Sequence, residues 1–497
     1  MNALYFLLFP FVSAVVLALC GRFTRLSQWV NLAANVAWAY LFVRLYQGHN
    51  PGEAGQFSVV YSWNWLPFLK SQFSLGLDGL NFPLMALNVF LSLTLSLYSL
   101  GKKNLTSGYF SLFMLLNGAS VGSLMAADAF AFYCFWEFML IPMYFLIGRW
   151  GSKNRVYAAL KFFAFTMGGS LFLLLSILGL AYGTSVPSLG WHDLVSLKLP
   201  FGAGGLTHSL QGLLFLGFLI AFAVKIPVWP VHTWLPDAHT EAPTGASVIL
   251  AGVLLKLGVY GIARWCLPIF PEASAYAAPS MIALGCAGIV LGAFAAWKQS
   301  DIKRMIAFSS VSHLGFMVLG LFALRVEAFQ GAMFQNLAHG LSTGLLFLVF
   351  GIIYDRTHSR EISLYSGLGQ HNPRLATVFV FAAMASIGLP GLPGFVGEFL
   401  ILTGTFVTAK VGALVALSGV LLGAIYTLSL VRRSVFGTES VLLRDHAVKL
   451  SWNEWLAVVP YVLALAYLGI GPQRILSESA MWAASLGWNA VTTGSLR

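Results

Sequence analysis

Long runs of hydrophobic residues, separated by short polar stretches, cover nearly the whole chain. An α-helix needs about 20 mainly apolar residues to cross a membrane. The pattern predicts about fourteen membrane-spanning helices, over residues 3–20, 27–46, 79–100, 108–126, 129–148, 159–183, 210–231, 243–266, 277–298, 303–324, 328–354, 375–408, 411–431 and 453–470. We therefore expect an all-α integral membrane protein, with surface hairpins and short helices over 47–78 and 184–209.

Two of these segments contain a pair of prolines, Pro227 and Pro230 in the seventh and Pro390 and Pro393 in the twelfth. Proline removes a backbone donor and breaks a helix. Broken backbone at membrane depth is tolerated only where protein or a water-filled cavity lines it. Because the two breaks lie five helices apart and each has a charged residue nearby, we expect two inverted five-helix repeats with broken helices 7 and 12.

The resemblance to a known family, given below, implies a division of the chain into four parts. We expect N-terminal helices 1–3 with an outer loop, a first five-helix unit, a second inverted unit, and a C-terminal loop with the last helix and tail. Their boundaries are 1–107, 108–266, 277–434 and 435–497.

Composition supports a membrane protein, since 58% of residues are hydrophobic and only 9% are charged, against about 25% charged in soluble domains. No basic run with interleaved aromatics lies outside the membrane segments, so the net charge of +11 reflects topology and not nucleic-acid binding. Most Lys and Arg residues fall in loops after odd-numbered helices. The positive-inside rule then places those loops in the cytoplasm and both termini outside.

The chain carries no pattern typical of a metal or redox centre. The cysteines Cys20, Cys134, Cys266 and Cys286 are scattered, and neither CxxC nor HExxH occurs. Iron–sulfur clusters and zinc sites held by protein side chains usually have ligands at such spacings. We expect no metal and no cofactor-binding residues on this chain.

Four ionisable residues lie within hydrophobic segments, namely Glu137, Lys225, Lys256 and Glu398. Such residues cost several kcal/mol each at bilayer depth and are usually functional. Lys256 lies too deep in its helix to reach the interface easily. Lys225 can either cap exposed carbonyls or serve as partner to Glu137, which needs a proton or a cation beside it. Glu398 suits an uptake or exit half-channel.

Histidines occur in two groups. His313 and His339 lie in the tenth and eleventh spans with serines and Thr343 nearby, which suits either a proton relay or simple packing. The second group, in the loop after the seventh span, is expected to be solvated or to lock that loop; it comprises His232, His239, Asp237 and Glu241. A third polar group, Asp301, Lys303 and Arg304, is expected to anchor the tenth span at the interface.

Five long motifs are shared with one family: FWEFMLIPMYFLIGRWG, KIPVWPVHTWLPDAHTEAPTGASVILAGVLLKLGVYG, QSDIKRMIAFSSVSHLGFMVLG, AHGLSTGLLFLVFGIIYDRTHSREI and GLPGLPGFVGEFLIL. Over roughly residues 75–435 the chain resembles the antiporter-like membrane subunits of respiratory complex I, the proton-translocating NADH-quinone oxidoreductase. Related chains occur in multisubunit sodium/proton antiporters and membrane-bound hydrogenases. The resemblance is greatest to the member with glutamate in the twelfth span, here Glu398, where sister subunits usually have lysine.

The resemblance implies a buried proton relay, with Glu137 paired to Lys225. The matching residues are Glu137, Lys225, Lys256, His313, His339 and Glu398. We expect the proton to pass from Lys225 through the two histidines to Lys256 and then towards Glu398.

The resemblance also implies a translocase that works inside a larger complex of a bacterial inner membrane. Quinone reduction elsewhere would drive it, with FMN, iron–sulfur clusters and quinone on other subunits and none on this chain. Its partners would be other membrane-arm subunits, including sister antiporter-like subunits, the lipid bilayer and protons. Two alternatives stay open: a subunit of a sodium/proton antiporter or membrane-bound hydrogenase, and a structural membrane-arm spacer.

Overall fold

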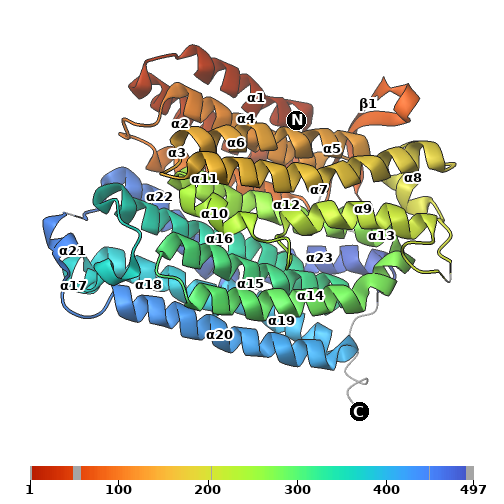
Figure 1. The fold of residues 1–497 in the computed structure, drawn as a ribbon. Coiled ribbons are helices and arrows are strands. Elements are labelled where there is room, and N and C mark those ends of the chain that lie inside the picture. The colour runs from red at the N-terminus through yellow and green to blue at the C-terminus, as the bar shows by residue number, and fades with distance from the viewer. Residues whose placement is uncertain (1–2, 49–56, 203, 447, 489–497) are drawn as a thin grey trace.

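The computed structural model describes residues 3–48, 57–202, 204–446 and 448–488. Most of its helices lie side by side with roughly parallel axes in one bundle (Figure 1). We call the end that carries the β1–β2 hairpin the hairpin end, and the opposite end, with α17 (Leu368–His371) and α21 (Val441–Asp445), the basic end.

The N-terminal part forms four helices and the hairpin. These elements are α1 (Ala3–Leu19), α2 (Thr24–Gly48), β1 (Ser58–Leu66), η2 (Pro67–Leu69), β2 (Ser71–Leu77), α3 (Phe82–Tyr98) and α4 (Ser107–Met125). The strands are antiparallel, with Ser62 opposite Ser74. Asp128 caps the next helix and also accepts hydrogen bonds from the Ser71 hydroxyl at 2.7 Å and the Gln72 backbone N–H at 3.0 Å. One carboxylate thus fixes the hairpin to the helix bundle.

The middle of the chain contains most of the interrupted helices. Its elements are α5 (Ala129–Phe138), α6 (Leu140–Trp150), α7 (Arg155–Gly183), α8 (Trp191–Ser196), α9 (Leu210–Lys225), α10 (Trp234–Glu241), α11 (Thr244–Ile249), η3 (Leu250–Leu254), α12 (Leu255–Gly261), η4 (Ile262–Cys266) and α13 (Leu267–Ile269). Because η3 and η4 are π-helical turns, the continuous run from α11 to α13 is wider than an ordinary helix on both sides of α12.

The last part supplies the second half of the bundle. Its elements, besides α17 and α21, are α14 (Pro271–Trp297), α15 (Ile302–Phe322), α16 (Val326–Thr357), η5 (Ile362–Tyr365), α18 (Pro373–Ile387), α19 (Pro393–Thr408), α20 (Lys410–Ser434), α22 (Trp452–Ile470) and α23 (Gln473–Ser485).

Helix breaks are present at both proline pairs, as predicted. The chain leaves the helix after Lys225 and resumes it at Trp234, and it is interrupted again between Ile387 and Pro393. At the second break Gly388 has φ = 80°, a left-handed conformation that favours glycine. The pattern did not predict the interruption at Met139 or the π turns.

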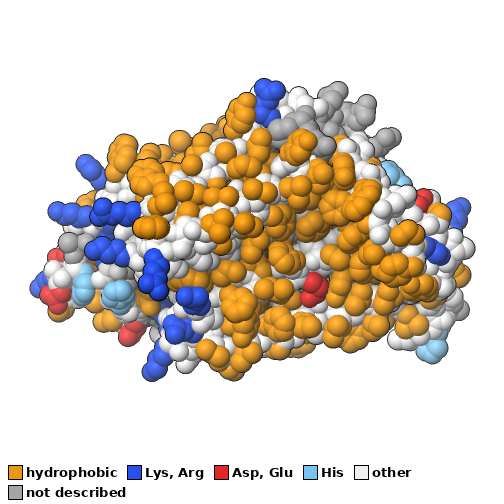
Figure 2. Space-filling model, turned by 90° about the horizontal axis from the view of Figure 1, so that it is seen from above, with side chains coloured by type: hydrophobic (Ala, Val, Ile, Leu, Met, Phe, Trp, Pro, Cys, Tyr) orange, Lys and Arg blue, Asp and Glu red, His pale blue; other side chains and the backbone are white. Residues whose placement is uncertain are grey.

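Each predicted membrane segment contains one or more helices, and the all-α membrane class is confirmed. Within the described ranges, nine helices or helix runs are long and apolar enough to cross a membrane, and five shorter apolar helices accompany them. Hydrophobic side chains cover the upper face of the bundle, while Lys and Arg gather at its left end, which is the basic end (Figure 2).

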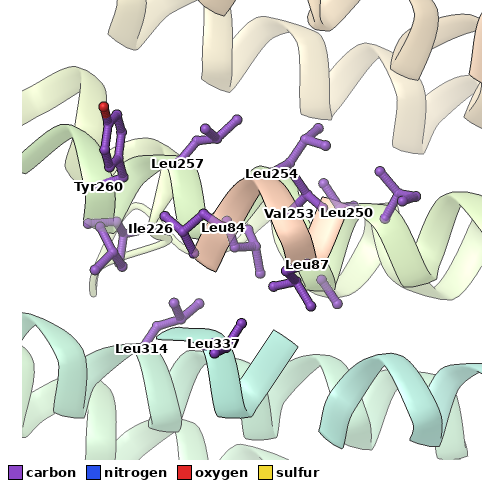
Figure 3. Close-up of a cluster of buried hydrophobic side chains, with 14 of the residues drawn as sticks. Leu84, Leu87, Ile226, Leu250, Val253, Leu254, Leu257, Tyr260, Leu314 and Leu337 are labelled. Carbon is purple, nitrogen blue, oxygen red and sulfur yellow. The ribbon is translucent and has the colours of Figure 1, made fainter. Parts of the chain in front are cut away.

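Apolar side chains surround the helix run that crosses the centre of the bundle. Leu84 and Leu87 of α3 lie beside this run, between Leu254 on one side and Leu314 of α15 and Leu337 of α16 on the other (Figure 3). An ionisable group in this layer is therefore removed from solvent and depends on polar partners within the bundle.

Candidate functional site

Lys256 lies in α12, between the two π turns, and its side chain is buried. Its Nζ is 2.5 Å from His339 Nδ1 on α16. Asn336, one turn away on α16, donates to the Lys256 carbonyl oxygen at 3.2 Å and ties the two helices together. At this distance the Lys256 ammonium can donate a hydrogen bond to a neutral His339 imidazole, whose Nδ1 then accepts. π turns of this kind recur at functional sites.

The polar contact continues from His339 to two further helices. The rings of His339 and His313, on α15, have centroids 5.3 Å apart. His313 Nδ1 lies 2.9 Å from Glu398 Oε1 on α19, and Gln335 Nε2 donates to the same oxygen at 3.0 Å. Lys256, His339, His313 and Glu398 thus form a buried chain across four helices.

The two histidines are the weakest link of that chain. Within the described residues, Nε2 of His313 and Nε2 of His339 are both buried without a hydrogen-bond partner. A buried polar atom without a partner is costly, and ordered water normally satisfies it. A proton can pass between the rings through such a water or by rotation of an imidazole.

Close packing of α16 against α19 sets the position of Glu398. A Cβ on Gly397 would lie 2.7 Å from Gln335 Cβ, and a Cβ on Gly331 would lie 2.7 Å from the Gly397 carbonyl oxygen. Small residues at helix crossings allow such approach in membrane proteins. The glycines therefore hold the Glu398 carboxylate within reach of both Gln335 and His313.

Glu137 and Lys225 form a second buried pair nearer the bundle surface. Glu137 is half-buried near the end of α5, and Lys225 is the last residue of α9. Lys225 Nζ lies 4.8 Å from the Trp136 ring centroid, a cation–π distance. Each residue is the charged neighbour that acts on the other, and Ser170 on α7 lies beside Glu137.

A polar cavity of about 180 Å³ opens at the basic end. Charged side chains from four segments line it, including Lys102, Glu241, Lys303 and Asp355. Lys303 is almost completely buried and donates to the Ala242 carbonyl oxygen at 2.8 Å. The cavity therefore has a buried lysine in its wall.

His239 lies deeper, on α10, and is fully buried. Its ring stacks on Phe347 with centroids 4.7 Å apart and an interplanar angle of 9°. In the part of the chain that the structure describes, neither ring nitrogen has a hydrogen-bond partner. Lys303 and Lys256 are the two cations whose charges act on this ring.

Comparison with known proteins assigns the chain to a family. The sequence model described as "NADH:quinone oxidoreductase/Mrp antiporter, TM" matches residues 126–425. The chain belongs to this family. Its match spans α5 to α20, the region that contains all six predicted relay residues.

Relatives and solved structures agree with the family match. NADH-quinone oxidoreductase subunit M of Rhodobacter capsulatus is 40% identical over 94% of this chain and 92% of that protein. A chain of respiratory complex I from Thermus thermophilus is 30% identical, with a TM-score of 0.86 over 97% of this chain and 99% of the other. A chain of the Mrp complex from Dietzia sp. DQ12-45-1b, 22% identical, has the same fold with a TM-score of 0.83 over 97% of both. As a member of this family the chain is a multi-pass integral membrane protein.

The geometry corrects one expectation about the family's relay residues. The histidines lie between Lys256 and Glu398, and not between Lys225 and Lys256 as predicted. Glu137 and Lys225 act on one another as charged neighbours, as expected, although Lys225 Nζ has no hydrogen-bond partner among the described residues. The Trp136 ring lies 4.8 Å from the Lys225 ammonium group.

One expectation about the polar loop residues was wrong. His239 is neither solvated nor a loop lock, because its side chain is fully buried and its ring nitrogens have no hydrogen-bond partner among the described residues. By contrast, Asp237 does lock the loop, since it accepts from Lys161 at 2.6 Å and from Arg304 at 3.0 Å. His239 was misjudged because it lies in a polar stretch directly after the predicted seventh span.

Gln335 was also missed, although it binds the Glu398 carboxylate directly. A glutamine four residues before His339 lies on the same face of a helix. That spacing was the available signal for its role.

Proposed function

We propose that this chain is a proton-translocating membrane-arm subunit of an NADH-quinone oxidoreductase, and so part of a translocase. The observation that carries the proposal is the buried chain from Lys256 through His339 and His313 to Glu398. Relays of this kind in a membrane are expensive and serve to move protons.

The chain's topology follows from the same assignment. We propose fourteen spans with two inverted five-helix repeats, and parts bounded at 1–107, 108–266, 277–434 and 435–497. The concentration of Lys and Arg at the basic end (Figure 2) favours a cytoplasmic position for that end. Both termini then lie outside, in a bacterial inner membrane.

Proton uptake would begin in the cavity at the basic end. Lys303 lines this cavity, and the charges of Lys303 and Lys256 both act on the His239 ring. The proton then moves from Lys256 to His339, to His313 and to the Glu398 carboxylate. At each step the proton is bound by a side-chain nitrogen or oxygen of the relay instead of by water.

The Glu137–Lys225 pair would control the relay from its other side. A change in the charge of Glu137 would change how strongly it attracts the Lys225 ammonium group beside Trp136. Movement of the Lys225 ammonium would then change the electrostatic potential at Lys256. Moving one charge against 100 mV costs about 2.3 kcal/mol, so an external reaction must drive the cycle. We assign the drive to quinone reduction, with FMN, iron–sulfur clusters and quinone on other subunits and sister antiporter-like subunits as neighbours.

A sodium/proton antiporter subunit is the second candidate, because the Mrp chain shares the fold. In that case transport would depend on sodium and would proceed without electron transfer. Co-purification of peripheral redox subunits, together with sodium-independent pumping, separates the two.

The test of the first proposal is Lys256→Met in the assembled complex, reconstituted into vesicles. We expect fewer protons translocated per electron while electron transfer in the presence of uncoupler persists. Lys410→Met is the control, since Lys410 is exposed at the start of α20. An unchanged ratio in Lys256→Met contradicts the proposal, whereas loss of assembly in this and milder variants such as Lys256→Gln indicates the structural spacer.

A further inference from the structure

An apolar groove of about 350 Å³ lies on the flank of the bundle at the hairpin end. Residues from α2, α3, α16, α22 and α23 form it, and its lining is mostly aromatic and aliphatic, as with Phe42, Phe82, Phe90 and Leu468. It is separate from the relay and from the polar cavity at the basic end. The groove extends along α3 from its start at Phe82 to Phe90, so its long axis follows the helices, as an acyl chain does in a membrane.

The groove has a polar mouth made by two charged residues one turn apart on α23. Arg474 Nε lies 3.6 Å from Glu478 Oε1, which is longer than a direct hydrogen bond. The Arg474 guanidinium lies 5.1 Å from the Tyr46 ring centroid, and its side chain is 63% exposed. Glu478 is nine-tenths buried, so its carboxylate is held in place at the edge of the apolar lining.

The position of α23 is fixed independently of any ligand. Gln330 on α16 donates to the Leu476 carbonyl oxygen at 2.9 Å, and Phe329 stacks on Trp482 with centroids 5.1 Å apart. The Arg474–Glu478 pair is therefore presented on a docked helix and not on a free terminus.

We propose that this groove binds a zwitterionic phospholipid with an ethanolamine headgroup. The Arg474 guanidinium donates to the phosphate oxygens, and the Glu478 carboxylate accepts from the primary ammonium. An acyl chain fills the groove along Phe82, Phe90 and Leu468. A cation and an anion side by side match a headgroup that carries both charges, whereas an anionic headgroup would meet the Glu478 carboxylate unpaired.

The bound acyl chain would touch the helix that carries His339. Leu337 and Leu341 line the groove and lie on either side of His339 in α16. Leu87, on the groove wall, is close enough that a Cβ on Gly340 would lie 2.6 Å from its Cδ2. The bound lipid would thus pack against α16 on the side away from the His339 ring. A role of this packing in the relay rests on the proposed function, while lipid binding itself does not.

Lipid retention by the purified assembled complex tests the inference. The complex is delipidated, incubated with vesicles of equal phosphatidylethanolamine, phosphatidylcholine and phosphatidylglycerol content, and analysed by native mass spectrometry and electron cryo-microscopy. We expect ethanolamine lipid to be enriched and density to fill the groove. The double variant Arg474→Gln/Glu478→Gln should lower enrichment about tenfold, the effect of losing a charge-assisted hydrogen bond.

Arg444→Gln is the matched control, because Arg444 has the same 63% side-chain exposure and lies near an acid, Glu439, but at the opposite end. Ala464→Phe, which fills the groove without touching the charged pair, should also exclude the lipid. Equal retention of all three lipids, preference for phosphatidylglycerol, or density for a protein helix in the groove would overturn the proposal. Because retention is measured without turnover, a failure of pumping leaves this result unaffected.

Discussion

Substitution of Gly397 by alanine should lower the number of protons translocated per electron, although it removes no ionisable group. The new Cβ would lie 2.7 Å from both Cβ and Oε1 of Gln335. Ordinary contact begins near 3.4 Å, so α19 must move away from α16 by about 0.7 Å. Such overpacking costs about 1–3 kcal/mol, which an assembled subunit tolerates.

The shift acts directly on the Glu398 carboxylate. Gln335 donates to Glu398 across the same helix pair at 3.0 Å, and a displacement of about 0.7 Å stretches this bond beyond hydrogen-bonding distance. A bond to a charged group contributes about 1.5–3 kcal/mol. We therefore expect Gly397→Ala to slow proton arrival at Glu398 by about tenfold or more.

The assay is the ratio of protons translocated to electrons transferred in vesicles containing the assembled complex. Gly168→Ala on α7 is the control, because a Cβ there meets nothing within 4 Å, and alanine favours the helix. A wild-type ratio in Gly397→Ala, with α19 displaced in the variant structure, would refute the claim that Glu398 works through this geometry.

Three other substitutions test separate parts of the account. His239→Phe keeps the stack on Phe347 but removes both ring nitrogens, so pumping should fall while assembly persists; full pumping would exclude His239 from the uptake path. Arg264→Met breaks the fully buried Arg264–Asp78 ion pair and should destabilise the subunit by about 3–5 kcal/mol, measured as lost thermal stability of the complex. The Arg264→Met/Asp78→Asn double variant should regain stability, because no buried charge is left unpaired. A double variant as unstable as Arg264→Met would argue against a charge effect. Asp128→Ala removes the cap of α5 and both bonds to β2, at about 1–3 kcal/mol, and proteolysis of the hairpin should accelerate; unchanged cleavage would show that other contacts hold the strands.

Hydrophobic runs and proline placement predicted most of the long helices and the two breaks, because both are local properties of the sequence, but not α23, which lies in the predicted tail. The π turns around Lys256 and the interruption after Glu137 could not be predicted, since they depend on packing between helices that are distant in the chain. His339 and His313 were recognised as candidates from the sequence. Their position between Lys256 and Glu398 could not be predicted, because it depends on how α15, α16 and α19 cross.

Burial was the second property that sequence could not supply. Lys303 and His239 lie in polar stretches, and only the fold around α10 and α15 removes them from solvent.

The central claim is that protons move from Lys256 to Glu398 through the two histidines. The most direct test is the number of protons translocated per electron by the reconstituted complex carrying His313→Leu, which removes the middle link at similar volume. The account predicts a lower ratio while uncoupled electron transfer is retained. The same ratio as the unsubstituted complex, with assembly intact, would contradict it.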